Sequence, residues 1–199
     1  MVNHPPHPRT IPPDFLLMAY CSGYFPMADS LNGEIDWYSP DPRTIFELEE
    51  FRIPRSLKLI LKKQPFDIRV NQAFEEVMRG CAGRAETWIS EDIIQSYGEL
   101  HRLGFAHSVE CWKEGMLAGG LYGVAVGAAF FGESMFSIER DASKVALVQL
   151  VQRLRERGFE LLDTQFMTPH LARFGAREIP RKEYLKRLAR ALTKQPSFT

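Results

Sequence analysis

This sequence of 199 residues has few cysteines, no excess of either charge and no long apolar run. Cys21, Cys81 and Cys111 are far apart and form no Cys-x-x-Cys pair, which argues against a disulfide framework and favours reduced thiols. The 25 basic and 25 acidic side chains cancel, so a nucleic-acid partner must be bound by a local patch. The longest apolar runs, 15–20 and 124–131, are too short to span a bilayer. We therefore expect a cytoplasmic protein without a membrane segment.

Metal-binding patterns and internal repeats are also lacking. The histidines have no spacing with cysteine or acidic residues that is typical of a metal site. They are His4, His7, His101, His107 and His170. We expect no metal, and we expect the last two histidines to be structural hydrogen-bonding groups.

The composition is that of an ordinary globular protein, with 45% hydrophobic and 25% charged residues. The length suits one full domain with a small addition. Five prolines in 1–13 predict a loosely attached tail. We expect a small N-terminal α/β domain at 14–53 and a larger C-terminal domain at 54–199.

Hydrophobic periodicity and turn residues predict alternating helices and strands. Helices are expected from Asp14 to about Gly23 and at 55–63, 72–80, 91–103, 142–157 and 182–193. Strands are expected at 35–38, 66–70, 108–112, 116–124, 128–136 and 159–165. Asp14, Ser90 and Asp141 are the expected helix caps.

This order predicts an α+β fold with an antiparallel-rich sheet. Three antiparallel strands followed by a helix, a strand and a helix resemble the acetyltransferase-like (GNAT) fold, which by itself indicates little about chemistry. Acyl-CoA enzymes of that fold hold the pyrophosphate with a Gly-rich loop before the long helix. Residues 137–142 occupy that place and contain no glycine, so we expect no acyl-CoA cofactor.

The most informative chemistry lies in 132–137 and in the strand that ends at Gln165. Glu133 stands beside an apolar Met and Phe, while Asp163 and Gln165 are two residues apart. Because alternate residues of a strand share a face, Asp163 and Gln165 are expected to project together. Carboxylates beside apolar walls suit a site that holds an apolar group next to a cationic amine.

Short motifs along the chain resemble those of the leucyl/phenylalanyl-tRNA–protein transferase family. They occur in the family's order from about Phe15 to about Tyr184. The matching segments are Tyr20-x-x-Gly23-x-Phe25-Pro26, Trp37-Tyr38-Ser39-Pro40-Asp41-Pro42-Arg43, Thr87-Trp88-Ile89, Ala106-His107-Ser108-Val109-Glu110-x-Trp112, Gly119-Gly120-Leu121-Tyr122-Gly123, Gly132 to Ser137, Ser143-Lys144-x-Ala146-Leu147, Asp163-x-Gln165, His170-Leu171, Gly175-Ala176 and Arg181-x-x-Tyr184.

The resemblance implies transfer of Leu, Phe or Met from aminoacyl-tRNA to proteins with N-terminal Arg or Lys, marking them for degradation by the N-end rule. It implies a GNAT-like catalytic domain behind a small N-terminal domain, and we expect a monomer. Two departures concern the N-terminal domain. The family's Gly- and Leu-rich segment before the first helix is missing, and Met27 stands where the family usually has a Trp that helps to hold the terminal adenosine.

Asp163 and Gln165 are the expected catalytic residues, with the carboxylate orienting the amide and helping to accept the amine proton. The alternative is that they end a strand in ordinary polar contacts. Glu133 is expected to pair with the acceptor's N-terminal Arg or Lys, or else to be a solvated charge at a strand end.

Apolar residues near Glu133 are expected to bind the substrates. The pocket for the transferred side chain is assigned to Leu121, Tyr122, Ser134, Met135 and Phe136, although such strand residues are more often plain core. Trp88 is expected to stack on the terminal adenine; Trp112, in an alternating strand, is a weaker candidate.

Two basic stripes could track tRNA phosphates, although a charge stripe is usually a solvated helix face. The first consists of Arg55, Lys58 and Lys62. The second consists of Arg187, Arg190 and Lys194.

Two other functions remain open. A non-catalytic relative would bind tRNA ends or basic N-termini without transfer, as the loss of the N-terminal segment would allow. The retained acid–amide pair argues against this, because a binding protein does not need it. A GNAT-like enzyme with another acyl donor is the third alternative.

Overall fold

The computed structural model describes residues 10–29, 34–84 and 87–199. Most of them surround one seven-stranded sheet with the strand order β4-β5-β6-β7-β8-β3-β9. The strands are β3 (Arg43–Phe46), β4 (Asp67–Val70), β5 (Ala106–Lys113), β6 (Met116–Val126), β7 (Ala129–Ser137), β8 (Leu161–Gln165) and β9 (Arg177–Ile179). The fold is therefore mixed α/β, and all strand pairs in this sheet except β7–β8 are antiparallel.

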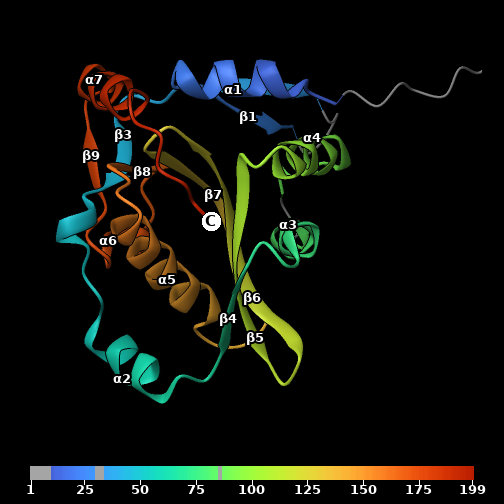
Figure 1. The fold of residues 1–199 in the computed structure, drawn as a ribbon, viewed down its shortest axis with the longest axis vertical. Helices are drawn as coiled ribbons and strands as arrows, with labels where there is room; N and C mark the ends of the chain where they lie inside the picture. Colours follow the sequence, from blue (N-terminus) through green and yellow to red (C-terminus); the bar gives the residue numbers. More distant parts are fainter. Residues whose placement is uncertain (1–9, 30–33, 85–86) are drawn as a thin grey trace, which may run out of the picture.

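The helices cover both faces of this sheet, as Figure 1 shows. On one side lie α3 (Phe74–Ala82) and α4 (Glu91–Arg102), and on the other lies α5 (Ala142–Glu156). A helix at each end of this view completes the frame: α1 (Pro13–Cys21) crosses the top, and α2 (Arg55–Lys63) lies at the bottom. The remaining helices are η1 (Leu48–Glu50), α6 (Pro169–Ala172) and α7 (Arg181–Ala191).

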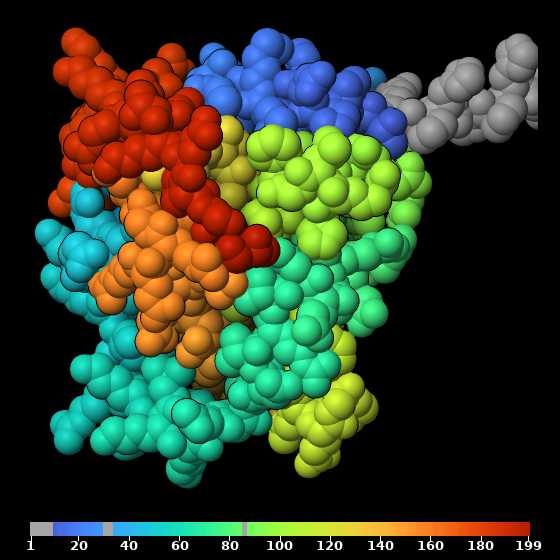
Figure 2. Space-filling view, in the orientation of Figure 1, coloured from blue at the N-terminus to red at the C-terminus, as the bar shows by residue number. Residues whose placement is uncertain are grey.

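The sheet separates two hydrophobic cores. One joins α1, α3 and α4 to the sheet through residues such as Tyr20, Tyr97 and Phe131. The other joins α5 to the opposite face through residues such as Phe130 and Leu147. Because successive side chains of a strand point to opposite faces, Phe130 and Phe131 lie in different cores. Figure 2 shows the C-terminal residues, in red, crossing the surface between the orange and green segments.

A second, two-stranded sheet lies beside α1. It pairs β1 (Phe25–Ala28) with β2 (Ile35–Tyr38) in antiparallel fashion. The carbonyl of Trp88 accepts a hydrogen bond of 3.1 Å from the Ala28 N–H, which ties β1 to the segment before α4.

The seven-stranded sheet opens between β7 and β8. Their parallel pairing joins Ala129–Phe131 to Leu161–Asp163 and then stops, although β7 continues to Ser137. Since the facing parts of the two strands are unpaired beyond this point, side chains can fill the space between them. The residues that carry the predicted chemistry lie at this opening.

All the predicted helices and strands are present, with their ends shifted by a few residues. The Ser90 cap is confirmed, because its Oγ accepts the Ile93 N–H at 3.3 Å. The cap at Asp14 is wrong, because Asp14 lies inside the first turn of α1. Asp141 does occupy the N-cap position of α5, but its side chain makes no cap hydrogen bond and pairs with Lys144 instead.

The sequence prediction missed β1, β3, β9, α6 and η1. The strand β3 lies between β8 and β9 in the large sheet, although its residues belong to the predicted N-terminal domain. Residues 1–9 of the predicted tail lie outside the described residues. Within the rest of that tail, Ile11 is buried and its N–H donates to Ser96 Oγ at 2.8 Å.

Candidate active site

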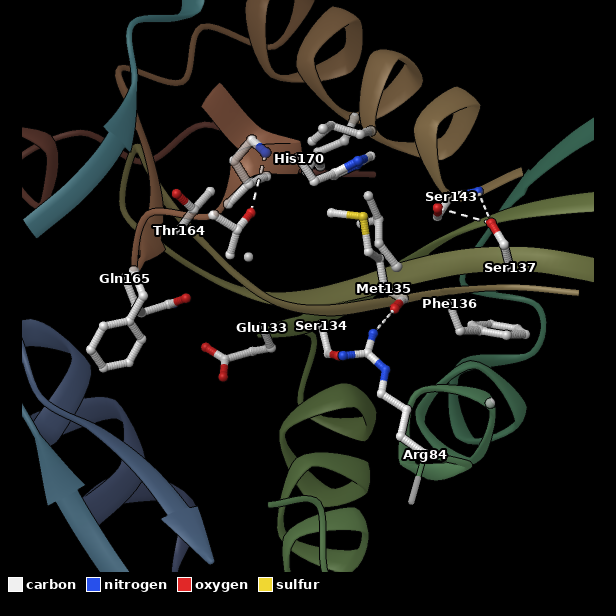
Figure 3. A pocket seen from close by; sticks show the side chains of 18 of the residues that line it. Arg84, Glu133, Ser134, Met135, Phe136, Ser137, Ser143, Thr164, Gln165 and His170 are labelled. Carbon is white, nitrogen blue, oxygen red and sulfur yellow. Dashed lines mark hydrogen bonds between the residues drawn. The ribbon is translucent and has the colours of Figure 1, made fainter. Parts of the chain in front are cut away.

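The opening between β7 and β8 holds a pocket of about 810 Å³, which we call the β7–β8 pocket. Figure 3 shows its labelled side chains converging from β7, β8, the start of α5 and the loop after α3. Of the predicted substrate and catalytic residues, most line it: Trp88, Leu121, Glu133, Ser134, Met135, Phe136 and Gln165. Residues from four separate parts of the chain thus meet in one cavity.

Glu133 is the ionisable group on the β7 side of the pocket. Its Oε1 accepts a hydrogen bond of 2.7 Å from the Tyr20 hydroxyl, which also contacts the Tyr97 hydroxyl. Burial raises the pKa of Glu133 to about 8; the Tyr20 hydrogen bond opposes this rise, and the nearby Asp163 charge adds to it. The protein thus compensates the ionised form of Glu133 only weakly.

Asp163, on β8, is compensated far more completely. It is fully buried, and Arg43 donates to it through Nε at 2.9 Å and through Nη2 at 2.7 Å. The Tyr184 hydroxyl donates to it at 2.7 Å. Burial opposes the charge of Arg43, but the interaction with Asp163 outweighs it and the pKa of Arg43 is raised. Asp163 does not line the β7–β8 pocket.

Gln165 lies over Asp163 and turns into the pocket. Its backbone N–H donates to Asp163 Oδ1 at 2.9 Å, and its φ of 59° lies in the left-handed region. The chain therefore leaves the strand conformation here, and the expected common face of Asp163 and Gln165 is not formed. Gln165 is 6% exposed, and within 10–29, 34–84 and 87–199 its Nε2 has no hydrogen-bond partner. An unpaired buried donor is costly unless a ligand satisfies it.

One wall of the pocket is apolar. Leu121 and Met135 are cross-strand partners on β6 and β7, and they face Leu147 and Leu150 of α5. Tyr122 was predicted for this wall, but it does not line the pocket. As the next residue along β6 it points to the other face, where it is fully buried and contacts the rings of Phe74 and Tyr97.

The other wall contains Trp88, Ser134 and Phe136. Phe136 packs so closely on α3 that a Cβ at Gly80 would lie 2.6 Å from its ring. Arg84, in the loop after α3, also lines the pocket and donates to the Met135 carbonyl (Figure 3). Within the part of the chain that the structure describes, no carboxylate pairs with Arg84.

The two basic stripes differ. Arg55, Lys58 and Lys62 are exposed on α2, outside the β7–β8 pocket. The second stripe is paired with acids. Arg187 contacts Glu47 and Glu183, while Arg190 and Lys194 contact Glu160. The first stripe is therefore the better candidate for phosphate contacts, and that role stays a prediction.

Sequence reasoning gave no role in the site to Arg43, Tyr20, Tyr97 and Arg84. Arg43 and Tyr20 occur in the quoted motifs, but nothing in their spacing shows that they reach carboxylates more than 100 residues away. In the described residues no three His, Cys, Asp or Glu side chains gather as a metal site would require. None of the described helices has the length and apolar content needed to cross a membrane.

Sequence comparison places these residues in a known context. Residues 45–189 match the profile of the family described as Leucyl/phenylalanyl-tRNA protein transferase, and 9–41 match that of its N-terminal domain. A leucyl/phenylalanyl-tRNA–protein transferase from Akkermansia muciniphila is 56% identical over 187 residues, covering 92% of this chain and 97% of the relative. One from Gloeobacter violaceus is 54% identical over 183 residues, with 92% and 95% coverage.

A solved structure of L-PGS from Bacillus licheniformis is similar over 82% of this chain and 56% of that chain, with 15% identity and a TM-score of 0.42. That likeness is too low to carry an argument about the fold or the site.

Proposed function

Because this chain belongs to the leucyl/phenylalanyl-tRNA–protein transferase family, we propose that it transfers Leu, Phe or Met from aminoacyl-tRNA to acceptor proteins with N-terminal Arg or Lys. The observation that carries the proposal is the β7–β8 pocket, in which a weakly compensated carboxylate and an unpaired amide donor stand beside an apolar wall. The product would be marked for degradation by the N-end rule.

The apolar wall suits the transferred amino acid. Leu121, Met135, Leu147 and Leu150 can surround a linear, branched or aromatic side chain, since Met adapts to several shapes. Trp88 offers a ring for the terminal adenine. The exposed stripe Arg55, Lys58 and Lys62 would contact phosphates farther along the tRNA.

Glu133 suits the cationic acceptor. A guanidinium or ammonium next to this carboxylate forms charge-assisted hydrogen bonds. The same cation favours the ionised carboxylate and lowers its raised pKa. Binding of the acceptor and loss of the Glu133 proton are therefore coupled, and acceptors with Ala or Glu at the N-terminus lack the side-chain cation.

The reaction forms an amide bond and breaks the ester to the tRNA ribose. The neutral α-amine attacks the ester carbonyl, the amine proton is transferred, and the ribose oxygen leaves with a proton. Nε2 of Gln165 can donate to the carbonyl oxygen as negative charge develops there. Asp163 holds Gln165 in place through its backbone N–H, so we assign it a positioning role; holding a reactive ester beside the amine provides much of the rate.

For the fold we propose a GNAT-like catalytic domain behind a reduced N-terminal domain. Because β3 belongs to the large sheet, the boundary between them lies before β3 rather than at the expected 53/54. We further propose that the protein acts as a monomer in the cytoplasm. The antiparallel arrangement of β4 to β7 and the helix α5 that follows it support the GNAT-like assignment.

The test incubates the protein with labelled Leu-tRNA or Phe-tRNA and four peptides that differ only at residue one. We expect label transfer to peptides beginning with Arg or Lys and none to those beginning with Ala or Glu. Equal labelling of all four peptides would overturn the acceptor assignment. Binding of the charged tRNA without transfer to any peptide would instead identify a non-catalytic binding protein.

A further inference from the structure

One aromatic ring at the β7–β8 pocket is exposed. Phe166, directly after Gln165, lines the pocket and exposes 45% of its surface, whereas the neighbouring Phe25 exposes 3%. Single exposed apolar side chains are common, but one that lines a largely apolar pocket is placed to contact what the pocket binds.

The ring of Phe166 is supported on one side. Its centroid lies 5.8 Å from that of Phe25 in an edge-to-face contact. Phe25 is held in turn by stacking on Tyr38 at 6.1 Å and by the Arg43 guanidinium at 4.8 Å from its centroid. The Phe166 N–H donates to the Thr164 carbonyl at 2.7 Å. Because ring and backbone are both held, little conformational entropy is lost when a planar group packs on the exposed face.

Phe166 and Trp88 mark the two ends of β1. Phe25 contacts Phe166, and Ala28 is hydrogen-bonded to the Trp88 carbonyl. Three residues of a strand span about 10 Å. Stacked neighbouring bases are about 3.4 Å apart, so two bases could occupy the two rings only in an extended single strand, as at a splayed RNA end.

We propose that Phe166 stacks on the base of the nucleotide that precedes the terminal adenosine of the charged tRNA. This rests on the proposed function, which brings the terminal adenosine to Trp88. Arg84 supports the same occupant, since it lines the pocket and has no carboxylate partner among the described residues. A cation that lines the same pocket as the two rings suits the phosphate that links two nucleotides.

The test compares two non-hydrolysable competitors, phenylalanine joined by an amide to adenosine alone and to the trinucleotide CCA. Their binding is measured by calorimetry with the wild type, Phe166→Ala, Phe166→Tyr and the control Phe15→Ala. Phe15 is similarly exposed, at 46%, but lies on α1 against Trp37. We expect Phe166→Ala to weaken the trinucleotide compound about tenfold, the scale of one lost stacked base, and the adenosine compound less than twofold. Phe166→Tyr and Phe15→Ala should bind both as the wild type does.

Equal weakening of both compounds by Phe166→Ala would overturn the inference, because the ring would then act on the terminal adenosine or on pocket shape. Unchanged binding of both, with a changed KM only for acceptor peptides that differ at residue two, would assign the ring to the peptide instead. A wild type that transfers Leu but does not prefer the trinucleotide compound would overturn the inference alone. Absence of transfer and of binding to either compound would overturn the proposed function as well.

Discussion

The two sides of the β7–β8 pocket each carry one carboxylate, and the two are compensated very differently. Asp163 on β8 accepts hydrogen bonds from Arg43, from Tyr184 and from the Gln165 backbone. Glu133 on β7 accepts a hydrogen bond from the Tyr20 hydroxyl and has a pKa of about 8. The first carboxylate is held by the protein, and the second has weaker compensation, which is why we propose that a cation of the acceptor meets it.

The difference suggests two tasks: Asp163 stabilises the structure of the site, and we propose that Glu133 recognises the ligand. A fully paired buried charge fixes the backbone around it, and here that backbone presents Gln165 to the pocket. A weakly paired charge costs stability and is retained where a ligand supplies the partner. We therefore propose that Asp163 positions Gln165, and that Glu133 on the opposite strand is the better candidate for contact with the substrate.

Removal of Arg43 should have the largest effect, because it abolishes the compensation that distinguishes Asp163 from Glu133. Arg43→Met leaves Asp163 as an unpaired buried charge, and we expect a loss of about 3–5 kcal/mol in the free energy of unfolding, measured by urea titration. The control is Arg177→Met, which removes an exposed pairing with Glu47 and should cost about 1 kcal/mol or less. Similar losses for the two variants would show that Asp163 is not held as described.

Gln165 and Asp163 should be separable by kinetics and stability. Gln165→Ala should lower turnover roughly tenfold or more with little change in the urea midpoint, because its Nε2 has no hydrogen-bond partner among the described residues. Asp163→Asn should lower turnover by a similar factor and also reduce stability, since it weakens the contact with Arg43. Near-normal turnover of both variants at saturating donor would make the pair purely structural.

Glu133 should make the protein less stable as the pH rises. Between the ordinary pKa of about 4.5 and the raised pKa of about 8, the folded chain keeps a proton that the unfolded chain has lost. The stabilisation that this proton gives the folded state is fully present below about pH 4.5 and is lost above about pH 8. Glu133→Gln should therefore raise Tm relative to the wild type by an amount that grows from pH 5 to pH 8 and then levels off.

The control for that measurement is Glu160→Gln. Lys194 lowers the pKa of Glu160, so neutralising Glu160 should reduce Tm at neutral pH and leave it unchanged at acidic pH, the opposite sign. A pH-independent difference between Glu133→Gln and the wild type would contradict the raised pKa.

A smaller change should follow from Tyr20→Phe. The Tyr20 hydroxyl favours the ionised form of Glu133, so its removal should raise the pKa of Glu133 further. The pH at which the KM for an Arg peptide reaches half of its total change should move upward, with turnover at high pH preserved. Tyr38→Phe, whose ring lies on β2, should leave the KM profile unchanged, whereas a downward movement with Tyr20→Phe would exclude the assigned hydrogen bond.

The smallest effect is expected on tRNA binding. Reversal of Lys58 and Lys62 to Glu should weaken charged tRNAs of any sequence alike, because phosphate contacts do not read bases. The wild-type salt slope should correspond to about three released counterions or fewer. Unchanged affinity and slope in filter binding would make α2 an ordinary solvated face.

Local signals in the sequence predicted most helices and the central strands of the sheet well. The Ser90 cap, the meander of β5 to β7 and the long helix α5 are read from neighbouring residues. By contrast, β3 and β9 contain four and three residues, too few to show a period, and they become strands through pairing with distant segments.

The candidate site was predicted in part. Glu133, Met135 and Gln165 were expected in one site, and all three line the β7–β8 pocket. Tyr122 was wrongly assigned to the pocket wall. Alternation along β6 puts Leu121 and Tyr122 on opposite faces of the sheet, but only the position of the cavity shows which of the two lines it. The neutralisation of Asp163 by Arg43 could not be read from spacing, since 120 residues separate the two side chains.

That separation has a consequence for the order in which the protein can fold during synthesis. Arg43 and the rest of β3 leave the ribosome early, but β8 and β9, on either side of β3, come from 161–165 and 177–179. The β5–β7 meander has only local pairings and can form first, since loop closure between distant segments is slow. The Arg43–Asp163 pair, and with it the position of Gln165, can be completed only when most of the chain has emerged. The arrangement around Gln165 is therefore completed late, because it requires one segment from early in the chain and two from late in the chain.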